Sequence, residues 1–438
     1  MSPLAIIGFI AFVVLIIALL KAPIPPWAAF VAIPVVAALI AGISLSEIGN
    51  LAKSGWASVQ VAIVVTCFAI IYFSIMNDVG LFEVITTPLV KRVTHAKNPI
   101  YALCLTATLI ASISHLDGQG NTTIMITLPL MVPLFDQLKM DRRSLALSMG
   151  IAVGAMNLLP WTGPTRYTAV ALGMDPAEFW RYIIPAQLIM LGVGFLVARL
   201  VGKYEMKNGA LNQKLTSEVE IKESTSLCVV NKKYFIFNLC LTMVTILILV
   251  GSFLNSAVTF MLATAIALIV NYKDKKTVAK KIRDFSGSAL PMTLNVIGIG
   301  VLIGIMTEGG FINAMAESLM ALMPKSVGPF VYIIIAILAM PLLMMLGTGP
   351  YYQGLVPVIL ALAVSYGVNP IIAAAVMLVP TGVSVCVSPM ISANHISSGM
   401  LGFSIGDFIK YAWKWVLVVS WIAIPVVYFT VSLLVKLF

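Results

Sequence analysis

Charged residues are scarce in this chain. Only 10% of its 438 residues are Asp, Glu, Lys or Arg, whereas 60% are hydrophobic and the mean hydropathy is +1.04. Soluble domains carry about 25% charged residues, so a soluble core of this length would leave too much apolar surface in water. The composition therefore excludes a soluble globular protein and predicts a chain embedded in a lipid bilayer.

Motifs for catalysis and for ATP-driven work are also missing. The chain has no GxxxxGK[ST] phosphate-binding loop and no HExxH zinc sequence. Its five cysteines form no CxxC pair, and nearly all lie in apolar runs, where we expect packing rather than disulfides or metal ligation. We therefore expect neither an enzyme nor a resident metal or cofactor.

Apolar runs long enough to cross a bilayer follow one another from end to end. A transmembrane helix needs about 20 such residues. The first run lacks a basic leader and a small-residue cleavage site, so we expect a retained span rather than a signal peptide. The predicted spans cover 3–20, 27–44, 57–76, 177–201, 233–252, 256–271, 287–306 and 411–435, and the amphipathic segments 77–98 and 307–327 are expected in the membrane interface.

Each half also contains a pair of apolar helices joined by a polar, glycine-rich turn. Such a turn is tolerated at membrane depth only where protein or a water-filled cavity surrounds it, so we expect two re-entrant hairpins. A further helix in each half is expected to break at prolines or polar residues. The hairpins cover 99–116 with 121–138 and 328–346 with 351–366, and the helices at 142–159 and 370–386 are expected to break at Pro160–Pro164 and Ser388–Asn394.

The order of segments recurs in the second half, and residues recur with it. LGMDPAEFWRY at 172–182 aligns with LGFSIGDFIKY at 401–411, an offset of 229. Pro160 and Pro389 share this offset, and NDVG aligns with TEGG 230 residues further on. Three matches at a nearly constant offset indicate an internal duplication.

Each half has an odd number of crossings whether its helical pair spans the membrane or re-enters, so the halves are inverted relative to each other. We predict an all-α membrane protein of two inverted-topology repeats, each with about five transmembrane helices, a re-entrant hairpin and a broken helix at the substrate site. The first repeat is predicted at 1–201 (scaffold helices 1–76, interfacial helix 77–98, transport part 99–201), a cytoplasmic linker at 202–232, and the second repeat at 233–438 (scaffold helices 233–306, interfacial helix 307–327, transport part 328–438).

Basic residues are unevenly distributed in this topology. Of the 27 Lys and Arg, 22 lie on one side and four on the other. The positive-inside rule makes the rich side cytoplasmic. Both termini of this multi-pass protein are then extracytoplasmic, and we expect the cell membrane as its location. Because the charges lie in loops along one side, they argue for a lipid bilayer and against nucleic acid as the partner.

The first hairpin tip, HLDGQGNTT, carries groups suited to an anion. A helix that begins near Asn121 directs unpaired N–H groups and a positive dipole end into the cavity, which is an arrangement that binds carboxylates. An ordinary helix N-cap uses the same residue types, so both interpretations stay open. His115 is expected to pack or hydrogen-bond beside the tip. The candidate substrate contacts are Gly118, Gln119, Gly120, Asn121, Thr122 and Thr123, and Asp117 is a candidate for coupling.

The first broken helix adds the only arginine predicted at membrane depth. Arg166 can hold a carboxylate with two parallel hydrogen bonds, and carbonyls freed by the break can bind a cation. The alternative is an internal pair between Arg166 and Asp117. The candidate substrate contacts here are Thr162, Gly163, Thr165 and Arg166.

The second half offers a different set of side chains. At the 229 offset His395 takes the place of Arg166, and a histidine can titrate near neutral pH as a proton-coupling group must. A neutral histidine satisfied by the backbone is the alternative. The candidate substrate contacts are Thr348, Gly349, Tyr351, Tyr352, Ser392, Asn394 and His395, and His395 is also a candidate for coupling.

These segments resemble the citrate–metal:proton symporter family of the ion transporter superfamily. The resemblance is carried in order, over almost the whole chain, by LDGQGNTTIMITLPLMVPL, MNLLPWTGPTRYTAVALGMDP, INAMAESLMALMPKSVG, PYYQGLVPVILALAVSYGV and GMLGFSIGDF. It implies a homodimer with scaffold and transport domains and an elevator-like movement. It also implies proton-driven uptake of citrate, often complexed with a divalent metal such as Mg²⁺ or Ca²⁺.

Two positions depart from the family pattern. Members often carry a second acid in the first tip, where this chain has Gln119, and often Asn-Asp in the second tip, where this chain has Thr348-Gly349-Pro350. Two carboxylates that could face a metal are therefore missing, and a free di- or tricarboxylate stays open as the substrate.

The leading hypothesis is thus a carrier of citrate or a related carboxylate, with a proton favoured over sodium as the coupling ion. A sodium-coupled symporter of another organic acid, such as a dicarboxylate or gluconate-like acid, is the alternative within transport. An anion channel or a non-transporting receptor is the alternative of another class. Two alternately facing hairpins disfavour a channel, and no soluble signalling domain supports a receptor.

Overall fold

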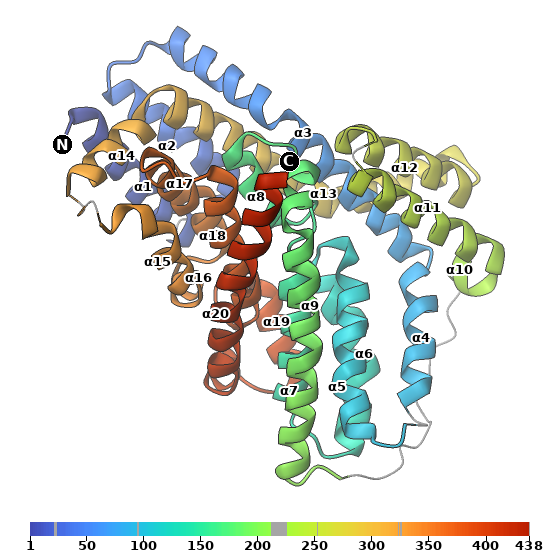
Figure 1. Ribbon diagram of the computed structural model, residues 1–438. Coiled ribbons are helices and arrows are strands. Elements are labelled where there is room, and N and C mark those ends of the chain that lie inside the picture. Colours follow the sequence, from blue (N-terminus) through green and yellow to red (C-terminus); the bar gives the residue numbers. More distant parts are fainter. Residues whose placement is uncertain are drawn as a thin grey trace.

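The computed structural model describes residues 1–21, 24–93, 96–211, 226–251, 253–322, 324 and 326–437, and these are helical with no β-strand. The first half forms one long series of helices (Figure 1). Its elements are α1 (Pro3–Lys21), α2 (Pro26–Ile40), α3 (Leu45–Asp78), α4 (Leu81–Val93), α5 (Pro99–Ser114), η1 (His115–Asp117), α6 (Gly120–Gln137), α7 (Arg142–Met156), α8 (Gly163–Leu172) and α9 (Pro176–Lys207).

The second half repeats this order after the short α10 (Leu227–Val230). Each long helix of the first half has a counterpart, and the first hairpin helix α5 corresponds to the pair α15 and α16. The elements are α11 (Lys232–Gly251), α12 (Ser256–Asn271), α13 (Lys275–Ile303), η2 (Gly304–Glu308), α14 (Phe311–Leu322), η3 (Gly328–Phe330), α15 (Val331–Ile337), α16 (Ala339–Leu346), η4 (Pro350–Leu355), α17 (Val356–Ser365), α18 (Pro370–Ser384), η5 (Val385–Val387), α19 (Ser392–Leu401) and α20 (Ile405–Leu437).

Corresponding helices of the two halves pack against each other. The counterparts α3 and α13 are in contact, α3 also contacts α12, and α13 contacts α2, the counterpart of α12. The counterparts α9 and α20 run side by side in opposite directions (Figure 1). This reciprocal packing is the arrangement expected of inverted repeats.

The contact between α3 and α13 depends on glycine. A Cβ on Gly55 would lie 1.9 Å from the carbonyl oxygen of Gly300, and one on Gly304 would lie 2.0 Å from that of Leu51. Small residues permit such close approach of helix backbones in a membrane. At one end of this pair Lys281 forms an ion pair with Asp78, and at the other Ser54 donates a hydrogen bond to Glu308.

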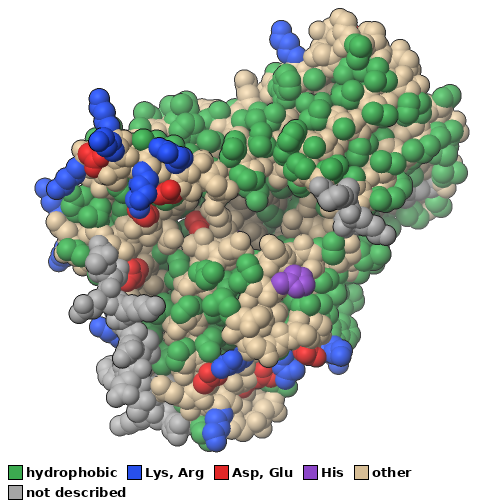
Figure 2. Space-filling model, turned by 180° about the vertical axis from the view of Figure 1, so that it is seen from behind, with side chains coloured by type: hydrophobic (Ala, Val, Ile, Leu, Met, Phe, Trp, Pro, Cys, Tyr) green, Lys and Arg blue, Asp and Glu red, His purple; other side chains and the backbone are tan. Residues whose placement is uncertain are grey.

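Seven described helices are long and apolar enough to cross a membrane, and an eighth span arises if the bent pair of α15 and α16 counts as one. Hydrophobic side chains cover wide areas of the outer surface, while basic side chains gather toward one edge and one end (Figure 2). The chain is therefore an all-α, multi-pass membrane protein.

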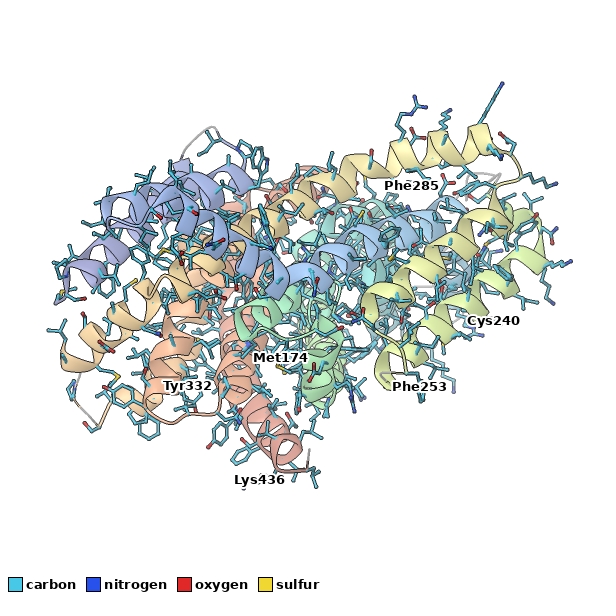
Figure 3. The ribbon with its side chains drawn as sticks, turned by 90° about the horizontal axis from the view of Figure 1, so that it is seen from above. Met174, Cys240, Phe253, Phe285, Tyr332 and Lys436 are labelled. Carbon is cyan, nitrogen blue, oxygen red and sulfur yellow. The ribbon has the colours of Figure 1, made fainter. Side chains whose placement is uncertain are left out.

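The molecule is elongated when seen from above (Figure 3). Cys240 on α11 lies toward one end and Tyr332 on α15 toward the other. In the view of Figure 1, α1–α3 and α11–α13 form an upper layer, and α5, α6, α7, α19 and much of α9 and α20 extend below it. The candidate site lies where these two parts meet.

Several predicted boundaries differ from the structure. The helices α3, α9, α13 and α20 start or end well beyond the apolar runs, because polar turns prolong them into the interface. Ser44 caps the amide of Glu47 at the start of α3, and Asp274 caps that of Thr277 at the start of α13. Hydropathy finds the part of a helix that lies in lipid and misses these capped extensions.

The predicted linker at 202–232 is also shorter than expected. Residues up to Lys207 continue α9, and α10 and the first residue of α11 occupy its far end. Residues 212–225, which include Lys214 and Lys222, lie outside the described part of the chain, as does Lys325. These three lysines contribute to the predicted charge asymmetry.

The second hairpin differs from the first in one helix. The predicted helix 328–346 is bent by 69° between α15 and α16. Pro341 lies in the first turn of α16 and has no N–H to donate to the carbonyl of Ile337, so the helical ladder is interrupted at this bend. At the 229 offset the first half has Ser112, and α5 runs unbroken to Ser114.

Candidate functional site

A cavity of about 440 Å³ lies between the tip of the first hairpin, the two broken helices and the scaffold helix α13. Proteins commonly bind small molecules in cavities of about this size. Ten predicted site residues line it: Asp117, Gly118, Gln119, Gly120, Asn121, Gly163, Arg166, Thr348, Ser392 and Asn394.

The tip of the first hairpin is held by Asp117. This carboxylate is 4% exposed and its Oδ1 accepts the amide of Gln119 at 2.8 Å. The Thr122 side chain also hydrogen-bonds to it. Gly118 has φ +71°, a left-handed conformation that glycine adopts without strain. These contacts fix the turn from which α6 begins, and Asp117 is the one acid among the lining residues.

Arg166 is buried beside this tip with its hydrogen-bonding capacity only partly used. It is 2% exposed, its Nη1 donates to the carbonyl of Trp161 at 3.3 Å, and its guanidinium lies 5.1 Å from the ring centre of Tyr167. Its Nε has no partner. No ion pair joins Arg166 to Asp117 among the described residues, so the predicted internal pair is not observed.

Three helices begin at this cavity without a side-chain cap. The N-cap residues are Gln119 for α6, Thr162 for α8 and Ile391 for α19, and none caps its helix through a side chain. The first N–H groups of a helix need partners and carry the positive end of the dipole. Together with Arg166, they make the cavity suited to a carboxylate-bearing anion.

Carbonyls near the two breaks have protein donors. The amide of Asn394 donates to the carbonyls of Val385 and Ser388, both at 2.8 Å. The hydroxyls of Thr162 and Thr165 both donate to the carbonyl of Asn157. The sequence suggested carbonyls at the first break for a cation, and the carbonyl of Asn157 beside that break is already hydrogen-bonded, as are those of Val385 and Ser388 at the second break.

Some predicted contact residues support the site without lining it. Thr123 is buried and its hydroxyl lies 2.8 Å from Nδ1 of His115. Thr162 and Thr165 are turned toward Asn157, and Thr122 toward Asp117. The hydroxyls of these threonines satisfy the backbone and neighbouring side chains in this conformation. Their role as substrate contacts stays a prediction.

The substrate contacts predicted in the second half agree less well with the lining of the cavity. The Tyr351 hydroxyl donates to the carbonyl of Met377 at 3.1 Å, and that of Tyr352 lies 2.7 Å from Thr381 Oγ1, so both phenols are used inside the protein. His395 is exposed and its Nε2 lies 2.7 Å from the carbonyl of Pro389. These three residues and Gly349 do not line the cavity. A helical offset placed His395 in register with Arg166 but could not show which way it points.

The structure adds lining residues that sequence reasoning missed. Asn157 is the clearest, because a polar residue three positions before Pro160 in an apolar helix was a usable signal. Ser397 and Ser398 are buried residues further along α19, and Ser288 comes from α13 across the scaffold interface. Nothing in the sequence around Ser288 indicates this contact.

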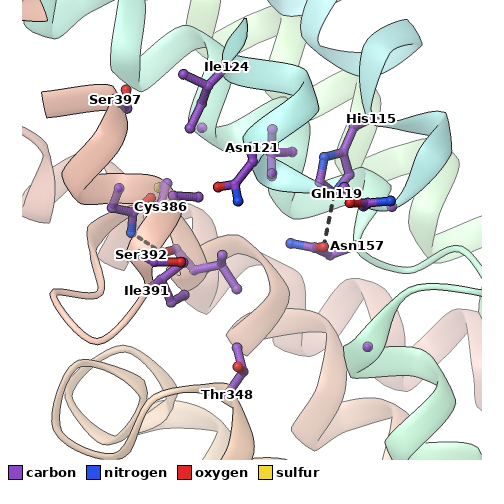
Figure 4. Close-up of a pocket in the computed structure, with 18 of the residues that line it drawn as sticks. His115, Gln119, Asn121, Ile124, Asn157, Thr348, Cys386, Ile391, Ser392 and Ser397 are labelled. Atoms are coloured by element: carbon purple, nitrogen blue, oxygen red, sulfur yellow. Dashed lines mark hydrogen bonds between the residues drawn. The ribbon is translucent and has the colours of Figure 1, made fainter. Parts of the chain in front are cut away.

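The close-up in Figure 4 shows how the tips meet. Asn121 projects between the two halves toward Ser392 and Cys386, and His115 lies to its right in this view, linked to Asn157. Thr348 approaches from the second hairpin. Residues from both repeats therefore face one another across the cavity.

A sequence model of the family described as citrate transporter, CitMHS, matches residues 4–380. The chain belongs to the citrate transporter family. Two similar proteins from Bacillus subtilis (strain 168) are a citrate transporter, 33% identical over 94% of this chain and 95% of the relative, and a Mg(2+)/citrate complex secondary transporter, 32% identical over the same shares. Membership in this family makes the chain a transporter and not an enzyme, as the sequence predicted.

The fold of this citrate transporter family member is also found among solved structures. The crystal structure of the Alcanivorax borkumensis YdaH transporter, described as having an unusual topology, aligns with a TM-score of 0.63 over 97% of this chain and 98% of that chain. The two share 14% sequence identity, so the likeness concerns the fold alone.

Proposed function

We propose that this protein carries out proton-coupled uptake of citrate, or of a related di- or tricarboxylate, by an elevator-type movement. The observation that carries the proposal is the buried guanidinium of Arg166, whose Nε has no partner, beside three uncapped helix N-termini in one cavity. Preorganised N–H groups and a guanidinium are complementary to several carboxylate groups of one small anion.

The relatives support citrate as the first substrate to test. One is named for citrate and one for its complex with Mg²⁺. Among the described residues no group of three His, Cys, Asp or Glu could hold a metal ion. If a metal is carried, we propose that it travels as part of the substrate, held by the oxygens of the acid itself. Mg²⁺ and Ca²⁺ both prefer such oxygen ligands.

Proton coupling is favoured over sodium coupling by the hydrogen bonding at the broken helices. Sodium sites in transporters of this kind use carbonyls of unwound helix segments. Here the carbonyls of Val385, Ser388 and Asn157 already accept hydrogen bonds from protein side chains. A proton needs no such cage, and Asp117, the acid of the cavity, is a candidate to carry one.

The contacts between scaffold and transport parts support the elevator proposal. Trp161 of the transport part packs on Phe73 of α3 and Phe260 of α12, with ring centres 5.0 and 5.4 Å apart. These two aromatic contacts contain no ion pair and can break and re-form as one part slides along the other. The hydrogen bonds that Ser256 of α12 donates to Asp175, before α9, would have to break with them. We further propose a homodimer assembled through the scaffold.

The decisive test is uptake by purified protein in liposomes. Citrate, tricarballylate, succinate and gluconate are offered with and without Mg²⁺ or Ca²⁺, under an imposed proton gradient or an imposed sodium gradient. We expect citrate to accumulate with the proton gradient alone. Accumulation only with sodium would replace the coupling ion, and no gradient-driven accumulation of any of these acids would overturn the proposal.

The orientation can be tested on its own. We propose the cell membrane as the location, with both termini outside and the end of α9 in the cytoplasm. Cysteines at Asn208 and Ser46, both exposed, should react with an impermeant maleimide from opposite sides. Intact cells should label Ser46→Cys and spare Asn208→Cys, and the reverse pattern would invert the topology. The unmodified chain, with its own five cysteines, gives the background labelling.

A further inference from the structure

A buried histidine connects the two elements that would bind the anion. His115 is 1% exposed and lies against the cavity. Its Nδ1 lies 2.8 Å from Oγ1 of Thr123 in α6, and its Nε2 lies 3.1 Å from Oδ1 of Asn157 at the end of α7. One imidazole thus bridges the first hairpin and the first broken helix.

The bridge extends to the groups that would touch substrate. The Thr123 hydroxyl donates at 3.0 Å to the carbonyl of Gln119, the residue at which α6 begins. On the other side, the main-chain carbonyl of Asn157 receives the hydroxyls of Thr162 and Thr165. Arg166 directly follows Thr165, so the network reaches both the uncapped helix and the guanidinium.

Counting protons shows which protonation states of His115 fit these three contacts. Thr123 has a single hydroxyl proton, so when it donates to Gln119 its Oγ1 can only accept a proton from Nδ1 of His115. Oδ1 of Asn157 is an acceptor only, so Nε2 must also carry a proton. All three contacts are satisfied together when His115 is an imidazolium. In a neutral imidazole with its proton on Nε2, the Thr123 hydroxyl must turn away from Gln119 to donate to Nδ1.

The orientation of the Asn157 amide decides between these states. Its NH₂ group has no partner among the described residues and lies on the side away from His115, toward the cavity (Figure 4). A carboxylate in the cavity would accept from this NH₂ and hold Oδ1 against His115. With the amide reversed, a neutral His115 protonated on Nδ1 would satisfy the same three contacts. An anion therefore selects the orientation that requires a proton on Nε2, and in that orientation all three contacts hold together only in the imidazolium.

We infer that His115 is a proton-carrying positioning residue, which takes up a proton when a carboxylate binds to Asn157 in the cavity. The inference rests on the proposed function and names the group that couples its two ions. The proton moves from water to the imidazole, and no other bond forms or breaks. Because coupling is reciprocal, the proton tightens carboxylate binding as much as the carboxylate tightens proton binding.

Other ionisable groups surround His115, and Asp117 among them is the alternative proton carrier. Asp117 and Arg166 are the charged residues that line the same cavity, and Tyr167 and Cys386 are its other titratable residues. The elements packed against η1 are α3, α5, α6 and α7. Their inner titratable side chains are Cys67, Tyr72 and Cys104, and none of these lines the cavity.

Burial makes the coupling tight. A fully buried imidazole without a nearby anion disfavours its charged form, because the protein interior solvates a charge poorly. An anionic substrate in the cavity offsets this cost. The empty carrier therefore keeps His115 neutral, and the loaded carrier takes up the proton.

The variant His115→Gln separates coupling from binding, because glutamine keeps an N–H donor but cannot titrate. Proteoliposomes are assayed for uptake driven by a pH gradient and for citrate–citrate exchange at equal pH, which needs no net proton movement. We expect gradient-driven accumulation to fall at least roughly tenfold while exchange stays within about threefold of wild type. His395→Gln is the matched control, because that histidine is exposed and outside the cavity, and it should behave as wild type.

Each outcome decides. If His115→Gln accumulates citrate under a pH gradient as wild type does, the inference is overturned. If wild type neither exchanges nor accumulates citrate, the proposed function has failed instead. If His115→Gln does not fold, Asn157→Asp serves in its place. It keeps the acceptor for His115 and loses the cavity-facing NH₂. We expect it to weaken citrate binding and to flatten the pH dependence of the apparent KM, and an unchanged pH dependence would count against the inference.

Discussion

Gly55 on α3 and Gly300 on α13 lie so close that a methyl group on Gly55 would meet the carbonyl oxygen of Gly300 at 1.9 Å. The contacted atom belongs to the backbone and cannot rotate away. The two longest scaffold helices therefore cross with their backbones in contact, and the ion pair of Lys281 with Asp78 holds one end of the crossing.

Gly55→Ala should destabilise this crossing. Overpacking against a backbone costs about 1–3 kcal/mol, so the thermal unfolding midpoint in detergent should fall by several degrees. Gly49→Ala is the matched control on the same helix, because nothing lies within 4 Å of its Cβ position. An unchanged midpoint for Gly55→Ala would show that the helices separate more easily than their packing implies.

Arg166→Gln should raise the KM for citrate about 10- to 100-fold, because hydrogen bonds to charged groups contribute about 1.5–3 kcal/mol. Arg166→Lys should recover only part of this loss, since lysine lacks the planar fork that binds a carboxylate at two points. Kinetics of uptake in proteoliposomes measure both variants. Arg199→Gln, at an exposed position on α9, is the control, and a wild-type KM for Arg166→Gln would remove Arg166 from the site.

Tyr351→Phe should change stability and leave the KM for citrate unchanged. The phenol is fully buried and donates to the carbonyl of Met377, so its loss leaves that carbonyl without this donor. The expected cost is about 1 kcal/mol in the free energy of unfolding, measured by denaturation in detergent. A raised KM with normal stability would restore Tyr351 as a substrate contact.

Acid should loosen the start of α13, which precedes the apolar run predicted to span the membrane at 287–306. Hydrogen bonds from the side chain and amide of Thr277 lower the pKa of Asp274 below its ordinary value of 3.8. A carboxylate with a lowered pKa in the folded state stabilises the fold above its ordinary pKa, and this contribution is lost as pH falls through the lowered value. Hydrogen exchange of residues 275–278, corrected for intrinsic rates, should accelerate there. Asp274→Asn should remove this pH dependence, and an identical pH response in the variant would contradict the assignment.

Sequence alone predicted the class of fold because composition and periodicity report on lipid and on helix faces. The offset between Pro160 and Pro389 located both broken helices, and HLDGQGNTT located the tip that lines the cavity. These features are local. A proline ends a helix, and a glycine-rich turn closes a hairpin, whatever surrounds them.

What the sequence could not supply was the direction of side chains. His395 has the right residue type and the right offset but points outward, because α19 begins at Ser392 and sets its rotation about the helix axis. Asn157 and Ser288 enter the cavity through tertiary packing, which leaves no periodic trace in the chain. The role of the threonines as substrate contacts stays a prediction, since hydroxyls that cap backbone and hydroxyls that bind ligand look alike in sequence.

The bend of 69° at the start of α16 bears on the energetics of the whole cycle. If the two inverted halves were identical, exchanging their conformations would turn the inward-open form of the carrier into the outward-open form. The two forms would then have the same free energy. Pro341 in the second half and Ser112 in the first half break this equivalence. Pro341 has no N–H, so the second hairpin helix can bend there without breaking a backbone hydrogen bond, whereas a bend at Ser112 would break one. If the carrier alternates between these two forms as proposed, its preferred resting orientation is set by where the halves differ, and a proline moved from one repeat to the other should shift it.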